Sequence, residues 1–374
     1  MTGDLVPWGA SPAGGVAACV GGWLLGHLLA RAVDGWFRAT DDGRVSRRAA
    51  AGVATASACV ACLLWWWEVR LGGQLPAGVS ADVVADPRDL AARCLAHAVL
   101  FWLLAAAAWI DLRQRVIPDW ITTPGTILGL CASWAWPGLL LPIAVEIPRS
   151  FAAPLLRLDG LAWHGGLHAG ASGPFAAAPH AGGLVLAVAL FAGWWVVCTD
   201  PGPEGPVGRP VGRFVILGLG QVAIAAAWWC GTMRFDALVT ALMGAGVSGG
   251  LVWATRAGAS WALGREAMGL GDVTLMALAG AWLGWQACVL AFFAAAFIGL
   301  AHGVGQFVRH RENELPFGPS LCLATALVVV AWRPAWVISA EHFARPGQLA
   351  AVVAAVVVLT AVTLLAWRGL RAGA

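Results

Sequence analysis

Long apolar stretches separated by short polar ones set the pattern of this chain. The apolar runs cover roughly 14–33, 49–67, 94–110, 120–141, 182–198, 214–230, 237–254, 273–285, 287–308, 316–330 and 349–367. A helix needs about 20 apolar residues to cross a bilayer, and only helices and closed barrels span lipid. Because the alternating pattern of barrel strands is absent, the runs predict an all-α, polytopic membrane helix bundle with about 10–11 transmembrane helices.

The composition agrees with a membrane protein. Hydrophobic residues make up 60% of the 374 residues and charged residues only 11%, whereas soluble domains carry about 25% charged residues. The formal net charge of +3 is small and diffuse, and no basic patch with interleaved aromatic residues indicates a nucleic-acid partner. The expected surrounding of the chain is therefore the lipid bilayer.

The arginines orient the predicted bundle. Basic clusters at 44–48, 113–115 and 309–311 lie between apolar runs, and more arginines fall on this side of the alternating spans than on the other. Cytoplasmic loops of membrane proteins carry an excess of Lys and Arg. The pattern predicts a multi-pass protein of the inner (cytoplasmic) membrane, with the segments around Asp111 and Asp272 facing the cytoplasm.

These two aspartates carry the candidate chemistry. Asp111 follows the run 94–110, and Asp272 precedes the run 273–285. A carboxylate at membrane depth costs about 2.5–3.5 kcal/mol on insertion scales, so its first interpretation is functional. Two adjacent carboxylates that share a proton can hydrolyse a peptide bond, one activating water and the other polarising the carbonyl group. We expect Asp111 and Asp272 to be a catalytic pair that needs no metal and no cofactor.

Residues beside the pair have predicted supporting roles. Asp119 is the competing carboxylate, but it follows Pro118 at a helix start, where we expect it to act as an N-cap. Gly269 and Gly271 allow an open helix start and close approach of a substrate backbone. Close packing between membrane helices is an equally favoured interpretation of these glycines.

Metal sites are only weakly indicated. Cys59 and Cys62 form a C-x-x-C pair with no second pair beside it, whereas a structural zinc site needs four ligands. His164, His168 and His180 lie in a long stretch with no acidic partner nearby. Apolar packing and a solvated external loop are the preferred interpretations.

Three segments together resemble the type IV prepilin peptidase family. They are Asp111 with Ile117-Pro118-Asp119, then Glu266-Ala267-Met268-Gly269-Leu270-Gly271-Asp272, then Leu315-Pro316-Phe317-Gly318-Pro319. The resemblance covers about 94–330 and implies an integral-membrane aspartyl protease of the GxGD type with Asp111 and Asp272 as catalytic pair. It also implies prepilin-like membrane proteins of type IV pili or type II secretion as substrates, cleaved after their basic leader on the cytoplasmic side.

Two features depart from the pattern of that family. Thr274 stands where the family usually has lysine, and the loop 34–48 lacks the four cysteines of a zinc module associated with N-methylation. We therefore expect a peptidase without the zinc module and without methyltransferase activity. Thr274 keeps a second interpretation open, a non-catalytic membrane scaffold of a pilus or secretion system. A proton-relaying transporter is less favoured, because no internal repeat is visible.

The resemblance also divides the chain into three parts. Residues 1–92 are expected to form N-terminal membrane helices with a short cytoplasmic loop, and 93–332 the catalytic membrane domain with an external insertion at about 142–180. Residues 333–374 are expected to add one further helix.

Overall fold

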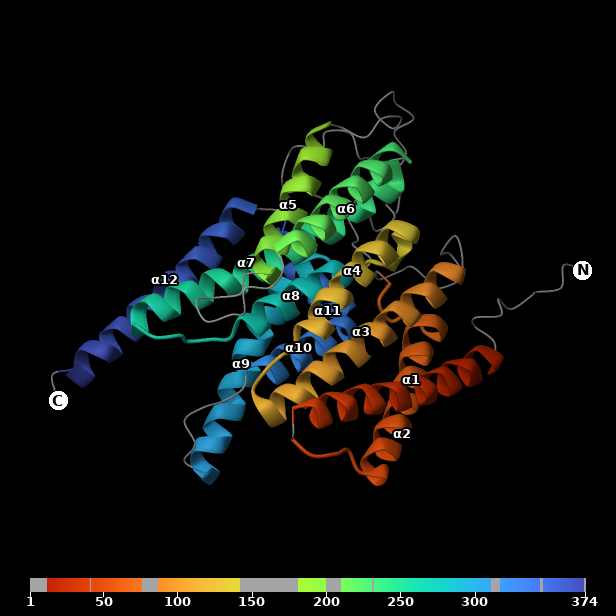
Figure 1. Ribbon diagram of the computed structural model, residues 1–374, viewed down its shortest axis with the longest axis horizontal. Helices are drawn as coiled ribbons and strands as arrows, with labels where there is room; N and C mark the ends of the chain where they lie inside the picture. Colours follow the sequence, from red (N-terminus) through yellow and green to blue (C-terminus); the bar gives the residue numbers. More distant parts are fainter. Residues whose placement is uncertain are drawn as a thin grey trace, which may run out of the picture.

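The architecture is that of a computed structural model, which describes residues 12–40, 42–75, 87–141, 181–199, 210–230, 232–310, 317–343 and 346–372. These residues form helices and no strand (Figure 1). The α-helices are α1 (Pro12–Ala39), α2 (Arg47–Leu64), α3 (Pro87–Gln114), α4 (Asp119–Ala135), α5 (Ala181–Thr199), α6 (Pro210–Trp229), α7 (Thr232–Leu263), α8 (Leu270–Leu283), α9 (Trp285–His310), α10 (Gly318–Val330), α11 (Trp332–Phe343) and α12 (Pro346–Ala372).

The described residues contain fewer full membrane spans than the sequence predicts for the chain. Among the described residues, five helices are long and apolar enough to cross a membrane, and α10 with α11, bent by 94° at their junction, would form a sixth. The described parts of α5, α6, α8 and α12 are apolar but shorter. The 14 residues of α8 measure about 21 Å, whereas the hydrocarbon core is about 30 Å thick. The polytopic all-α membrane bundle is confirmed, and among the described residues five to six helices are full spans by this criterion.

Helix α8 lies at the centre of the bundle (Figure 1). Every residue from Asp272 to Leu283 is buried, and α8 packs against α4 and α7, and also against α3, α9 and α10. A helix that is apolar on all sides is buried by its neighbours rather than by one face. The short α8 is therefore held by protein on all sides, and Asp272 in its first turn is buried with it.

Glycines allow the backbones around α8 to touch. A Cβ atom added to Gly280 would lie 2.1 Å from the Gly244 carbonyl oxygen, and one added to Gly244 would lie 2.0 Å from that of Gly280. On the α4 side, the Trp282 indole N–H donates to the Gly125 carbonyl at 2.9 Å. Small residues let membrane helices approach closely, which strengthens their dispersion contacts. The position of α8 is thus fixed by contacts that leave no room for a larger residue.

The predicted turn between the runs 273–285 and 287–308 is confirmed at Gly284. Its φ of 84° lies in the left-handed region, which glycine adopts without steric cost. Gly284 therefore ends α8 and starts α9 in a new direction.

Two element boundaries differ from expectation. The predicted loop 34–48 is shorter, because α1 continues to Ala39 and the Asp34 carboxylate accepts a hydrogen bond from the Val45 N–H at 2.8 Å. Helix α11 was not predicted, because Arg333 and Glu341 make its sequence polar. Its aromatic rings form one packed face instead, with the Trp332 and Trp336 centroids 5.4 Å apart.

The expected insertion 142–180, with its three histidines, lies outside the described residues.

The contact between α7 and α8 generates a first prediction. Gly280→Ala should lower the free energy of unfolding by about 1–3 kcal/mol, because the added methyl group overlaps the Gly244 carbonyl. Thermal unfolding in detergent measures the change. Gly250→Ala is the matched control, because this α7 glycine has no atom within 4 Å of the added Cβ. Equal stability of the two variants would contradict the close backbone contact.

Candidate active site

A cavity of about 380 Å³ lies where the ends of three elements meet. One wall comes from the end of α3 and the connection to α4, one from the segment leading into α8, and one from the start of α10. The lining residues are Asp111, Arg115, Val116, Ile117, Ala267, Met268, Gly269, Leu270, Gly271, Asp272 and Phe317. Both predicted catalytic aspartates therefore line the same cavity, although 160 residues separate them in the chain.

The two carboxylates are largely buried. The exposed fraction is 6% for Asp111, in the last turn of α3, and 7% for Asp272, in the first turn of α8. They are close enough for the charge on Asp111 to act on Asp272. Two buried carboxylates that interact in this way do not both ionise readily, so they are suited to share one proton.

Two helix N-termini face the carboxylates. Asp272 lies in the first turn of α8, and the backbone N–H of Gly318, the first residue of α10, interacts with the Asp111 carboxylate. A helix N-terminus carries a partial positive charge and free N–H groups, which stabilise a nearby anion. The fold thus offers electrostatic support for negative charge at both positions.

Gly318 must be small because of its position against Asp111. A Cβ atom at residue 318 would lie 2.5 Å from Asp111 Oδ2 and 2.8 Å from Ile117 Cδ1. Phe317 lines the cavity, and Pro319 occupies the first turn of α10, where a missing N–H costs no helical hydrogen bond. Pro316 lies outside the described residues.

The two glycines before Asp272 have different surroundings. A Cβ atom at Gly271 would lie 2.8 Å from Ile117 Cβ and 3.2 Å from the Ile117 carbonyl oxygen. Gly269 is the N-cap of α8 with φ −67° and ψ 152°, a conformation open to any residue, and its Cβ would have nothing closer than 3.9 Å. Gly271 therefore allows the start of α8 to pack closely against Ile117, whereas the position of Gly269 has room for a side chain.

The connection from α3 to α4 is a sharp turn. Arg115 has a positive φ of 57°, and Pro118 is extended and is the N-cap of α4. The expectation that Asp119 is the N-cap was wrong, because the Pro118 carbonyl already accepts the Ile121 N–H at 3.1 Å. Asp119 is the first helical residue, where its charge favours the helix dipole, and it does not line the cavity.

Thr274 is directed to its own helix. Its side chain is 2% exposed, and its hydroxyl donates to the Gly271 carbonyl at 3.1 Å. Thr274 is absent from the cavity lining. The residue that departs from the family pattern therefore stabilises the first turn of α8.

Both aspartates of this site lie in segments that are similar to known proteins. Residues 98–155 and 210–304, which include both aspartates, match the sequence model of the type IV leader peptidase family. These two segments, 153 of the 374 residues, are therefore similar to the type IV leader peptidase family. The resemblance inferred from the sequence motifs is thereby confirmed.

Several curated relatives of this family are similar over part of the chain. The prepilin leader peptidase/N-methyltransferase of Aeromonas salmonicida (strain A449) is 37% identical over 92 residues, 24% of this chain and 30% of the relative. That of Stutzerimonas stutzeri is 32% identical over 114 residues, 30% of this chain and 39% of the relative. The chain thus spans well under half of the length of the curated relatives it matches. No solved structure matches the chain.

The matched segment 210–304 also contains a tether, a set of contacts that holds the chain before α8. Arg256, near the end of α7, donates from Nε to the Met268 carbonyl at 2.8 Å and forms an ion pair with Glu266. The Ser260 hydroxyl accepts the Ala267 N–H at 3.1 Å. These contacts hold the segment that forms one wall of the cavity.

A second buried polar group lies outside the predicted site. Glu68 and His97 are 2% and 0% exposed, and both lie within helices long and apolar enough to span a membrane. A titratable residue within an apolar run, as for His97, or directly after one, as for Glu68, is the signal that would have identified them.

The tether generates a second prediction. Arg256→Gln should raise amide hydrogen exchange of residues 266–269 by about tenfold, because it removes a charge-assisted hydrogen bond of about 1.5–3 kcal/mol. Mass spectrometry of the exchanged peptides measures this. Arg265→Gln is the control, because Arg265 is exposed on the same segment. Unchanged exchange in Arg256→Gln would rule out the tether.

Proposed function

We propose that the chain is an intramembrane aspartyl endopeptidase. Its substrates are type IV prepilin-like precursors, and it removes their basic leader at the cytoplasmic face of the inner membrane. The single observation that carries the proposal is that Asp111 and Asp272 line one cavity and that both lie in segments matching the leader peptidase family.

The carboxylate pair supplies the hydrolytic chemistry. The ionised carboxylate takes a proton from a water molecule, and the resulting hydroxide attacks the scissile carbonyl carbon. The protonated carboxyl donates a hydrogen bond to the carbonyl oxygen and stabilises the negative charge that develops there. Because the pair shares one proton, the two roles belong to the pair as a whole. No metal or cofactor takes part in this proposal.

The walls of the cavity suit a substrate that changes from polar to apolar at the cut. Val116, Leu270 and Phe317 offer apolar contacts beside the carboxylates, and the membrane around the bundle accepts an apolar substrate helix. A leader with basic residues is attracted to the cytoplasmic side by acidic groups such as Glu266, which is exposed near the cavity.

A scaffold without catalysis is the less supported alternative. It was motivated by Thr274 alone, and Thr274 is buried against the Gly271 carbonyl, away from the cavity. A scaffold would not require two buried carboxylates around one cavity, each of which is costly at membrane depth.

The carboxylate pair generates a third prediction. Asp111→Asn and Asp272→Asn should each lower the rate of precursor cleavage by about 10²–10⁴-fold, because each amide has nearly the same shape but cannot share the proton. Co-expression with a prepilin-like precursor and measurement of precursor size checks this. Asp119→Asn, outside the cavity lining, should cleave like the wild type. Cleavage that survives either asparagine substitution would refute the pair.

The two glycines generate a fourth prediction in the same assay. Gly271→Ala should lower cleavage by about tenfold or more, because its methyl group displaces Ile117 beside the carboxylates. Gly269→Ala adds the same methyl group into free space and should remain active. The reverse order of activities would show that Gly269, rather than Gly271, is the glycine that the site requires.

A further inference from the structure

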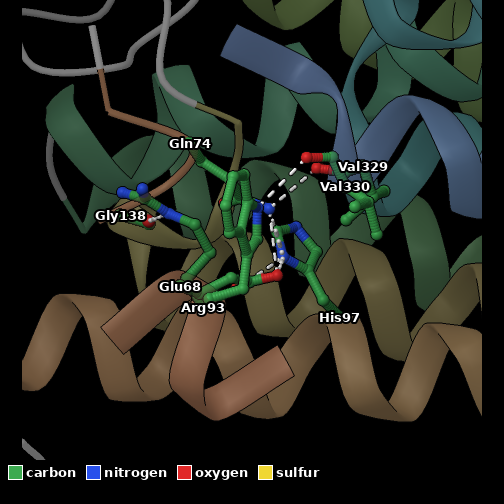
Figure 2. A network of polar contacts seen from close by, with 8 residues as sticks. Glu68, Gln74, Arg93, His97, Gly138, Val329 and Val330 are labelled. Carbon is green, nitrogen blue, oxygen red and sulfur yellow. Dashed lines mark hydrogen bonds and ion pairs between the residues drawn. The ribbon is translucent and has the colours of Figure 1, made fainter. Parts of the chain in front are cut away.

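The end of α10 farthest from the cavity is held by a buried polar network. Figure 2 shows Gln74, Glu68 and His97 directed toward one another, with Gln74 reaching the carbonyl oxygen of Val329. The Gln74 Nε2 group donates to Glu68 Oε1 at 2.9 Å and to the Val329 carbonyl at 3.1 Å. His97 Nδ1 lies 2.8 and 3.0 Å from the two carboxylate oxygens of Glu68.

This network satisfies the C-terminus of a helix. The last four carbonyl groups of an α-helix have no partner within the helix, and Val329 and Val330 are the last residues of α10. Gln74 accounts for the Val329 carbonyl, and the Trp67 indole N–H donates to the Val330 carbonyl at 3.1 Å. The cap lies where α10 and α11 meet at 94°.

The network orients Gln74 in a single way. Its Nε2 group carries two hydrogens, one for the Glu68 carboxylate and one for the Val329 carbonyl, whereas its Oε1 atom would be repelled by both oxygens. Glu68 is in turn held by His97, and both are almost fully buried. Removing one member of a buried polar pair leaves the other without compensation, so such networks specify one arrangement.

The network and the cavity lie about four helical turns apart along α3 and at the two ends of α10. On α3, His97 and Asp111 are 14 residues apart, which is about 21 Å. On α10, Val329 contacts the network through Gln74, and Gly318 contacts Asp111. Helices α3 and α10 pack against each other and run antiparallel. An axial shift of α10 therefore changes both ends at once.

We propose that Gln74, oriented by Glu68 and His97, is a positioning residue that fixes the axial position of α10 against α3 and so keeps Phe317 and Gly318 against Asp111. The inference rests on the proposed function for its catalytic consequence. Its physical basis is the absence of free space at Gly318, where a Cβ atom would already lie 2.5 Å from Asp111 Oδ2. A displacement of about 1 Å at a reacting group lowers a rate by as much as 10²-fold.

Directional bonds add to the packing of α10, which is largely apolar. Its buried residues include Leu321, Cys322, Ala324 and Val328 beside the polar Ser320 and Thr325, and apolar contacts have little directional preference. Hydrogen bonds at one end of the helix set its register, since a slip along the helix axis would break them.

The test compares Gln74→Leu with Gln221→Leu. Gln221 is the matched control, because its Nε2 group donates to the Val188 carbonyl at 3.2 Å and joins α6 to α5 in the same way. Hydrogen exchange is read at Gly318 and Leu321, whose N–H groups report the start of α10, and kcat and KM are measured with a cleaved prepilin-like precursor.

We expect Gln74→Leu to accelerate exchange at the start of α10 by about tenfold and to lower kcat by about tenfold, with KM changed less than about twofold. Gln221→Leu should change none of these. Trp67→Phe keeps an aromatic side chain and removes the indole N–H that donates to the Val330 carbonyl. It should give a smaller effect in the same direction, and it decides the test if Gln74→Leu does not fold.

Three outcomes separate the inference from the proposed function. Exchange that rises only at the α10–α11 junction, with the start of α10 and kcat unaltered, overturns the positioning role. An equal loss in Gln221→Leu overturns it as well. If the wild-type protein cleaves no precursor but Gln74→Leu still accelerates exchange at the start of α10, the positioning role stands and the proposed function fails.

Discussion

Backbone contact between α7 and α8 is the constraint on which the rest of the structure depends. Gly244 and Gly280 bring the two helices so close that each carbonyl fills the space of the other glycine's missing side chain. With α4 on another side, α8 is enclosed by protein although it is too short to cross a bilayer by itself. The first turn of α8 consequently holds the carboxylate of Asp272 buried inside the bundle.

Helix ends then assemble the site around Asp272. The last turn of α3 contributes Asp111, and the first turn of α10 contributes Phe317 and Gly318. Because the N-terminal turns of α8 and α10 lie at this region, the electrostatic support for the carboxylates comes from the backbone. Side chains act mainly as spacers and tethers: Ile117 fills the space beside Gly271, and Arg256 holds the segment before α8.

Polar side chains within the bundle have a further role in keeping these ends in register. The Glu68, Gln74 and His97 network is buried at the C-terminal end of α10, away from the cavity, where it meets α3 at His97. Most contacts in the bundle are made by small or apolar residues. Directional hydrogen bonds therefore decide between one axial position of a helix and the adjacent ones. A shift of α10 along its axis would therefore change its contacts at the network and at the cavity together.

The sequence alone determined the helical membrane class, the turn at Gly284 and the two aspartates, because apolar runs, glycine conformation and the cost of membrane carboxylates are local properties. It also predicted that Asp111 and Asp272 pair, and both do line one cavity. That Gly318 packs against Asp111, that Arg256 holds the segment before α8, and that Gln74 caps α10 were decided by the tertiary structure. Each of these contacts depends on which helices, far apart in the chain, pack against each other. The periodicity of apolar residues does not specify which helix packs against which.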